Sequence, residues 1–175
     1  MKTLLHVCCA PCSIACIEQL REESIDPTAF WHNPNIHPFT EYRARRDTVH
    51  AYMPEVGVPL IEGGKYGLRG FLDALPAWDE RCATCYALRL NATAAYAAAN
   101  GFSSFTSSLF ISPYQDHELL RSAAKAAAEA YGVEFLYRDF RARFRAGQQK
   151  AREMGLYMQK YCGCIFSEEE RYHKK

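Results

Sequence analysis

Short apolar runs alternate with longer amphipathic segments along the chain. The apolar runs are rich in β-branched and aromatic residues and occur at residues 3–7, 28–31, 58–61, 103–109 and 133–137. Each run is followed by a segment of helical character, and strands that alternate with helices form parallel sheets. The pattern therefore predicts an α/β fold, with a parallel sheet flanked by helices.

Several expected helix boundaries carry their own signals. Ser112, followed by Pro113 and by Gln115 three positions on, reads as a capping box that starts a helix. Gly101 and Gly132 fit as helix stops after alanine-rich stretches. The chain has no internal repeat and no Gly/Ser linker, so we predict one Rossmann-like domain over residues 1–175, with a helical C-terminal segment.

Composition narrows the class of protein. The 175 residues are 49% hydrophobic, which suits a globular domain with a real core. No stretch approaches the ~18 consecutive apolar residues of a membrane span, and the N-terminus has no signal-peptide pattern. We therefore expect a cytoplasmic protein, in which eight clustered cysteines favour metal binding or redox chemistry over structural disulfides.

Two cysteine pairs have the spacing of ligands for one metal centre. Cys8 and Cys9 directly follow the first predicted strand, where open α/β sheets bind their ligands and where the start of the next helix favours thiolates. Cys82 and Cys85 form a CxxC motif at the start of a predicted helix, which brings both sulfurs to one face. Together they supply four thiolates, enough for a 4Fe–4S cluster or for tetrahedral zinc, and the spacing does not choose between the two.

The remaining cysteines have less certain roles. Cys162 and Cys164 are separated by one glycine, a geometry that suits either a reversible dithiol or a second metal. A purely structural zinc site has no use for such a surplus pair, which favours redox chemistry. We expect Cys16 to be a small core residue, whereas Cys12 is open between a metal-related role and simple packing.

Polar stretches follow two other predicted strands. Residues 32–38 (HNPNIHP) and residues 107–117 (SSLFISPYQDH) both belong at the carboxyl edge of the sheet. Asp116 and His117 are therefore candidates to position or protonate a substrate, although turn and cap chemistry also explains these sequences.

The net charge of +1 conceals a strongly basic segment. Residues 138–152 carry six basic side chains and one acid, a net charge of +5, and the basic residues alternate with aromatics. Phosphate neutralisation together with base stacking requires this mixture, although a solvated helical face is the alternative. The candidates for contact with a nucleic acid are Arg138, Arg141, Arg143, Arg145 and Lys150.

The motifs CCAPC, NPNIHP, CxxC, SPYQDHELL and GLYMQKYCGC occur in this order along the chain. In this combination the chain resembles the QueH family of cobalamin-independent epoxyqueuosine reductases over nearly its full length. The resemblance implies a PP-loop or HUP-like fold and the last step of queuosine biosynthesis. In that step epoxyqueuosine at the wobble position of tRNA loses its epoxide oxygen in a two-electron reduction that gives queuosine.

The resemblance also implies cofactors, partners and residue roles. Cys8, Cys9, Cys82 and Cys85 would hold a 4Fe–4S cluster, with Cys12 as a further metal candidate. Cys162 and Cys164 would be redox-active or would bind an additional mononuclear iron. The implied substrates are tRNAs with GUN anticodons, which are those for aspartate, asparagine, histidine and tyrosine. The implied second partner is an external one-electron donor such as ferredoxin or flavodoxin. The resemblance implies no membrane partner.

Two other classes of protein fit part of the pattern. A zinc-stabilised tRNA-binding protein without redox activity is the first alternative, because zinc accepts the same thiolates. A PP-loop ATPase is the second, but CCAPCS stands where its glycine-rich phosphate loop would follow the first strand. The sequence therefore favours the reductase.

Overall fold

The computed structural model describes residues 2–173 and contains a sheet of five parallel strands. The strands are β1 (Thr3–His6), β2 (Thr28–Trp31), β3 (Leu60–Glu62), β4 (Ser104–Ser107) and β5 (Glu134–Phe135). Their order in the sheet is β3-β2-β1-β4-β5, so the first strand of the chain is the central one. The predicted Rossmann-like α/β fold is confirmed.

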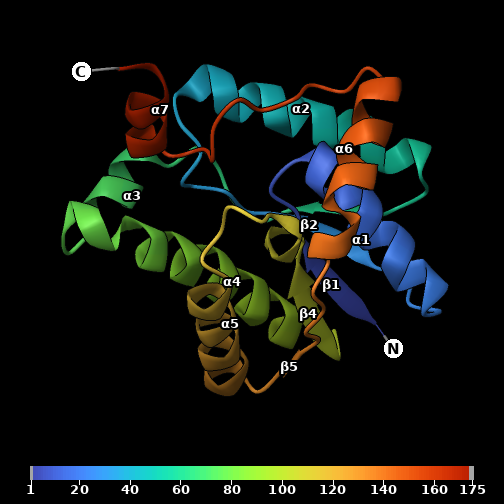
Figure 1. Ribbon diagram of the computed structural model, residues 1–175. Helices are drawn as coiled ribbons and strands as arrows, with labels where there is room; N and C mark the ends of the chain where they lie inside the picture. The colour runs from blue at the N-terminus through green and yellow to red at the C-terminus, as the bar shows by residue number, and fades with distance from the viewer. Residues whose placement is uncertain (1, 174–175) are drawn as a thin grey trace.

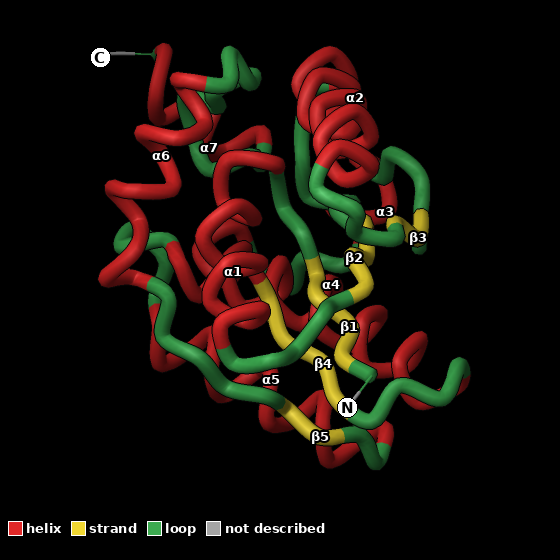
Figure 2. The backbone as a smooth tube through the Cα atoms, turned by 90° about the vertical axis from the view of Figure 1, so that its right-hand side faces the viewer, coloured by secondary structure: helices red, strands yellow, loops and turns green. Residues whose placement is uncertain are grey.

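The helices cover both faces of this sheet. They are α1 (Ala10–Glu22), α2 (Phe39–Glu55), α3 (Leu68–Asp73), α4 (Arg81–Ala99), α5 (His117–Tyr131), α6 (Phe144–Glu153) and α7 (Ile165–Tyr172). Figure 1 shows α1 and α6 together on one side of the sheet and α4 and α5 packed against each other on the other side. The view from the side in Figure 2 gives the same layers. Within residues 2–173, each helix is too short or too polar to cross a bilayer.

Side-chain caps decide where two helices begin. Helix α1 starts at Ala10, because the sulfur of Cys9 accepts a hydrogen bond from the backbone N–H of Cys12 and caps it. The capping box at Ser112 is wrong: its hydroxyl accepts from Tyr114 N in a turn. Helix α5 starts four residues later than predicted, at His117, where Asp116 caps it by accepting from the backbone N–H of Leu119 at 2.9 Å.

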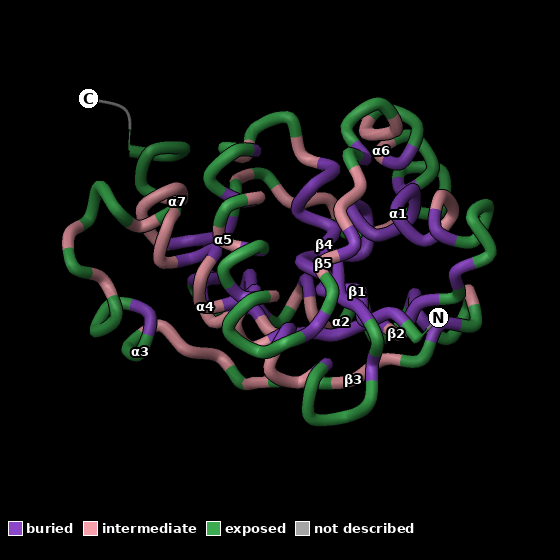
Figure 3. Tube along the Cα trace, turned by 90° about the horizontal axis from the view of Figure 1, so that it is seen from below, coloured by how far each residue is buried: buried purple, intermediate pink, exposed green. Residues whose placement is uncertain are grey.

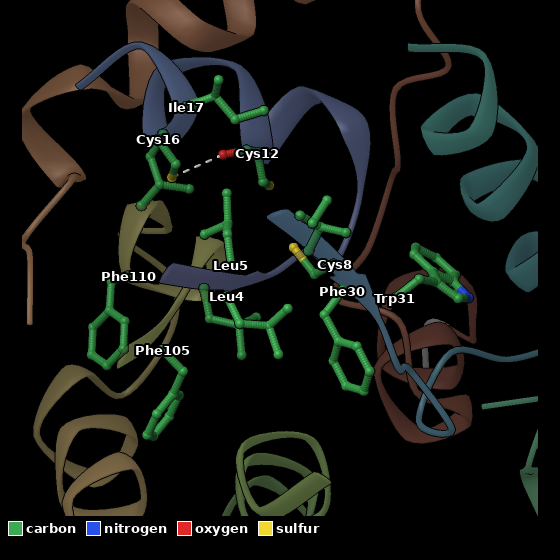
Figure 4. Packing of buried hydrophobic residues seen from close by; sticks show 14 of the residues in the cluster. Leu4, Leu5, Cys8, Cys12, Cys16, Ile17, Phe30, Trp31, Phe105 and Phe110 are labelled. Carbon is green, nitrogen blue, oxygen red and sulfur yellow. Dashed lines mark hydrogen bonds between the residues drawn. The ribbon is translucent and has the colours of Figure 1, made fainter. Parts of the chain in front are cut away.

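The core is continuous with the cysteine turn. All residues of β1 and β4 are buried, as Figure 3 shows, because helices cover the sheet on both sides. Cys16 is fully buried, as expected of a core residue, and its thiol donates to the carbonyl of Cys12 (Figure 4). The thiols at the start of α1 therefore pack directly against the hydrophobic core.

The C-terminal segment closes over the carboxyl edge of the sheet. Helix α6 packs on α1, and the chain then crosses above α2 to α7, as the orange and red ribbon in Figure 1 shows. There Phe71, Cys85 and Cys164 form a second, smaller buried cluster that joins α3, α4 and the start of α7. This covering segment places residues from both ends of the chain around one site.

Candidate functional site

Three cysteine sulfurs meet at the turn between β1 and α1. The sulfur atoms of Cys8, Cys9 and Cys12 all lie within 4.8 Å of one another, and those of Cys8 and Cys9 are 3.9 Å apart. All three residues are buried. Among residues 2–173 this is the one group of three or more His, Cys, Asp or Glu side chains with ligand atoms this close. The turn is therefore the clearest candidate for metal binding.

The three thiols differ sharply in acidity. Hydrogen bonding with the thiols of Cys12 and then Cys9 holds the pKa of Cys8 well below its usual value. Burial raises the pKa of Cys9, and the hydrogen bond with Cys8 is the main cause that raises the pKa of Cys12. Cys8 is thus the sulfur that carries negative charge first, while the other two lose their protons when a metal binds.

The end of strand β4 and the turn that follows it contribute polar groups to the same edge. The hydroxyl of Ser108 lies 3.1 Å from the backbone nitrogen of Cys8, from which it accepts, and 3.4 Å from the sulfur of Cys8, to which it donates. His6 is fully buried between Ser107 Oγ, at 2.9 Å, and the carbonyl of His32, at 3.1 Å. Burial, followed by the charge of Arg89, lowers the pKa of His6 to about 3, so this ring is neutral and fixes the strand ends.

The CxxC motif lies in the first turn of α4, as predicted, but its two sulfurs have different surroundings. Cys82 is exposed, whereas Cys85 is buried. Burial raises the pKa of Cys85 to about 12, and the nearby charge of Arg89 opposes this rise. Arg89 donates from its guanidinium to the sulfur of Cys85 at 2.8 Å. Neither cysteine belongs to the group of sulfurs at the start of α1.

The segment with Cys162 and Cys164 is held in place by α2. The guanidinium of Arg45 donates to the carbonyls of Cys162, at 2.8 Å, and Tyr161, at 3.0 Å. Arg45 is itself buried against Glu41 at 2.7 Å. The two cysteines of the segment differ: the sulfur of Cys164 caps α7, whereas Cys162 is exposed.

The polar loop after β2 also anchors this segment. The backbone N–H of His37 donates to the carbonyl of Gly163 at 2.7 Å, and Ile165 N donates to Nδ1 of His37 at 3.2 Å. Burial lowers the pKa of both His37 and His32. In the part of the chain that the structure describes, the loop contributes Asn35 and Ile36, rather than either histidine, to the wall of the cavity described next.

A cavity of about 920 Å³ lies between the cysteine turn and the C-terminal segment. Cys8, Cys12 and Cys162 line it, together with Tyr114 and Phe144, whose rings are 6.0 Å apart. Its basic residues are Arg45, Arg89, Arg145, Arg152, Lys160 and Arg171. Over residues 2–173 the wall contains no Asp or Glu, although the chain has 20 acidic residues. The cavity thus combines cysteine thiols with a positive field that favours an anionic ligand.

A family model described as "Epoxyqueuosine reductase QueH" matches residues 3–170 of the chain. The chain belongs to the QueH family. Proteins of the same name are 40% identical in Dehalococcoides mccartyi, over 99% of this chain and 96% of the relative, and 33% identical in Thermotoga maritima, over 98% and 92%. A Haemophilus influenzae protein of that name is 35% identical over 95% of this chain and 71% of its own length. QueH proteins are oxidoreductases that carry out the final step of queuosine biosynthesis.

The structure divides the basic segment of this QueH-family chain into two groups. Four of the five predicted tRNA-binding residues form ion pairs on the surface: Arg138 with Glu23, Arg141 with Asp139, Arg143 with Glu22 and Lys150 with Glu18. Arg145 instead lines the cavity beside Arg152. Among the described residues neither of these two forms an ion pair with a carboxylate.

The polar residues predicted to act on substrate have other partners. Asp116 is exposed and caps α5, and Nε2 of His117 lies 2.9 Å from the hydroxyl of Tyr137. In residues 2–173 the cavity wall includes neither of them, but it does include Gln115, their neighbour in the same loop. Gln115 donates to the sulfur of Cys162 at 3.3 Å.

Sequence reasoning missed three residues at the QueH-family site. Arg89 follows Cys85 by four residues on one helix, a spacing that puts its guanidinium beside the sulfur and that was readable in advance. Arg45 follows Glu41 at the same spacing, but Arg43 and Arg46 stand beside it and the sequence does not distinguish it from them. Gln159 donates to the sulfur of Cys12 at 3.6 Å across 147 positions, and no local pattern marks such a contact.

Proposed function

We propose that this chain reduces epoxyqueuosine to queuosine at the wobble position of tRNA. In this reaction the epoxide oxygen leaves as water with two protons, and two electrons restore the carbon–carbon double bond. The observation that carries the proposal is the cavity, which combines three cysteines with six cations and, over the described residues, no acid. Thiols suit the redox chemistry, and the positive wall suits a polyanionic RNA.

The chain offers enough sulfur to hold an iron–sulfur cluster. The residues that we propose as ligands are Cys8, Cys9, Cys82 and Cys85. The fit is supported by the three converging sulfurs at the start of α1, which include Cys12 as a further candidate, and by the buried sulfur of Cys85. When bound, such a cluster supplies electrons one at a time from a donor such as ferredoxin or flavodoxin.

Cys162 and Cys164 have a separate role in this proposal, either as a dithiol that stores electrons or as ligands of an additional iron. The amide of Gln115 holds the exposed sulfur of Cys162 toward the cavity. The contribution of Asp116 and His117 to proton delivery stays a prediction, and Gln115 is the better placed of the three to touch a bound substrate.

The anticodon loop would lie over the rim of the cavity. A wobble nucleotide is already partly unstacked, so it enters a pocket with little loss of stacking. We propose that Arg145 and Arg152, which form no ion pair within residues 2–173, neutralise phosphates near this nucleotide, and that the exposed ring of Tyr114 offers a stacking surface. The ion-paired arginines of the basic segment would contribute less, because their charge is already balanced.

This division of charges is testable by salt dependence. The double variant R145Q/R152Q should flatten the slope of log affinity against log salt by about 0.7–0.9 for each phosphate that is no longer neutralised. The matched control R141Q/R143Q removes two ion-paired arginines of the same segment and should change the slope little. If the control variant flattens the slope equally, the whole basic segment binds tRNA as the sequence predicts.

The function itself is tested by nucleoside mass spectrometry. Epoxyqueuosine-containing tRNA is incubated without oxygen with the iron- and sulfide-reconstituted protein and a strong one-electron reductant. We expect conversion to queuosine, and C162A should abolish it if that sulfur stores electrons or binds iron. No conversion by a protein that carries a full cluster would overturn the proposed reaction.

A zinc-stabilised tRNA-binding protein without redox activity is the alternative outcome. An iron–sulfur protein is brown after purification without oxygen, whereas zinc has a filled d shell and gives no colour.

We propose that this protein is located in the cytoplasm. All eight of its cysteines are free thiols, which suits a reducing compartment.

A further inference from the structure

Arg89 is a buried cation in unusual surroundings. The residue is 2% exposed, on the inner face of α4 one turn after Cys85. Over residues 2–173, no carboxylate lies within 4.0 Å of its guanidinium. Arginine stays charged in proteins, so this charge has to be balanced by something other than an acid.

Its contacts show what can balance it. The guanidinium donates to the sulfur of Cys85 at 2.8 Å, while Nε donates to the carbonyl of the same residue at 3.2 Å. Arg89 also lines the cavity together with Cys8 and Cys162. Among the described residues, the one side-chain acceptor of Arg89 is therefore a cysteine sulfur, and two further cysteines lie in the same cavity wall.

Arg45, another buried arginine of the cavity wall, has a different partner. It is equally buried but forms an ion pair with Glu41 at 2.7 Å. Within residues 2–173, Arg89 has the same degree of burial and no carboxylate partner. A thiolate is a much better acceptor for a guanidinium than a neutral thiol, so Arg89 favours the deprotonated, metal-binding form of its neighbours.

We infer that Arg89 is the counter-cation of the cysteine metal centre, which it stabilises through the sulfur of Cys85. A metal bound by several thiolates has a net negative charge, and reduction makes that charge larger. A cation fixed beside a ligand sulfur therefore tightens metal binding and raises the reduction potential. Arg89 is a positioning residue in this role, and the inference rests on the proposed metal site.

The first test measures the reduction potential of the reconstituted protein by a redox titration monitored by electron paramagnetic resonance. R89Q removes the charge and should shift the one-electron equilibrium at least tenfold toward the oxidised form, a drop of about 59 mV. R89K keeps a charge but loses the planar donor and should shift it less. R43Q removes an exposed cation of α2 that is not part of the described cavity wall and should leave the potential unchanged.

The second test does not require iron or activity. Cobalt(II) alone is titrated into the reduced, metal-free protein, and its affinity is measured for the wild-type protein, R89Q and R89K. We expect R89Q to weaken cobalt binding at least tenfold. Thermal unfolding of the metal-free and cobalt-bound forms should show that metal stabilises the wild-type protein more than R89Q.

The outcomes separate this inference from the proposed function. If the wild-type protein takes up no cluster, the proposed cofactor fails, and the cobalt affinities still decide the role of Arg89. If R89Q lowers the stability of metal-free and metal-bound protein equally, with potential and affinity unchanged, Arg89 is a structural residue. That result, or a variant that fails to fold without metal, overturns the inference.

Discussion

The buried pair of Arg45 and Glu41 allows a sharp stability prediction. Arg45 joins α2 to the C-terminal segment through the carbonyls of Tyr161 and Cys162, and its guanidinium and the Glu41 carboxylate are only 1% and 9% exposed as side chains. R45M keeps most of the side-chain volume but leaves the carboxylate buried without its cation. The variant therefore tests how far this ion pair holds the segment in place.

The magnitude follows from the burial of both partners. Removing one member of a buried ion pair destabilises a protein by about 3–5 kcal/mol, because the remaining charge is uncompensated. For a chain of this size each kcal/mol lowers the melting temperature by roughly 2–4 °C, so a drop on the order of 10 °C is expected. Replacing both partners with apolar residues, in E41L/R45M, removes the buried charge and should restore most of this stability.

The assay is urea unfolding of the metal-free protein with its thiols reduced, followed by circular dichroism. The exposed neighbour Arg43 provides the matched control, and R43M should change the free energy of unfolding by less than about 0.5 kcal/mol. E41L/R45M should recover stability but not activity, since the carbonyls of the segment still lack their donor. An R45M protein within about 1 kcal/mol of the wild type, or a double variant as unstable as R45M, would refute the reasoning.

Two further predictions concern the fold and the basic segment. A Cβ at Gly63 would lie 2.0 Å from the buried ring of Phe30, whereas a Cβ at Gly70 in α3 meets nothing within 4 Å. G63A should therefore lower the free energy of unfolding by about 1–3 kcal/mol, and G70A should preserve or raise it in the same urea assay. The hydrogen bond from Arg141 lowers the pKa of Asp139 from 3.8 to about 2, so this interaction stabilises the fold above pH 4 and is lost as the pH falls through 2. In R141Q the pKa of Asp139, followed by carbon NMR, should return toward 3.8; a value that stays near 2 would assign the shift to another group.

Local sequence patterns predicted much of the architecture. The strand at Thr28–Trp31 has the predicted bounds, and Gly132 ends α5 in the left-handed conformation expected of a helix stop. The start of α5 was misplaced because Ser112 and Asp116 both satisfy the local rules for a cap, and only the path of the turn between them decides which one is used. Ends of elements depend on such competition, whereas buried strands depend on hydrophobicity alone.

For the site, the sequence alone predicted the kind of chemistry. The cysteine motifs that follow β1 and start α4 predict sulfur ligands at the carboxyl edge of the sheet, because strands and helix spacing follow from short-range patterns. Tertiary structure decided which charges pair between distant segments. Arg143 pairs with Glu22 across 121 positions, whereas Arg145 lines the cavity. Charge pairing between distant segments depends on how the C-terminal segment folds back over α1 and α2, and a linear sequence contains no local signal for that path.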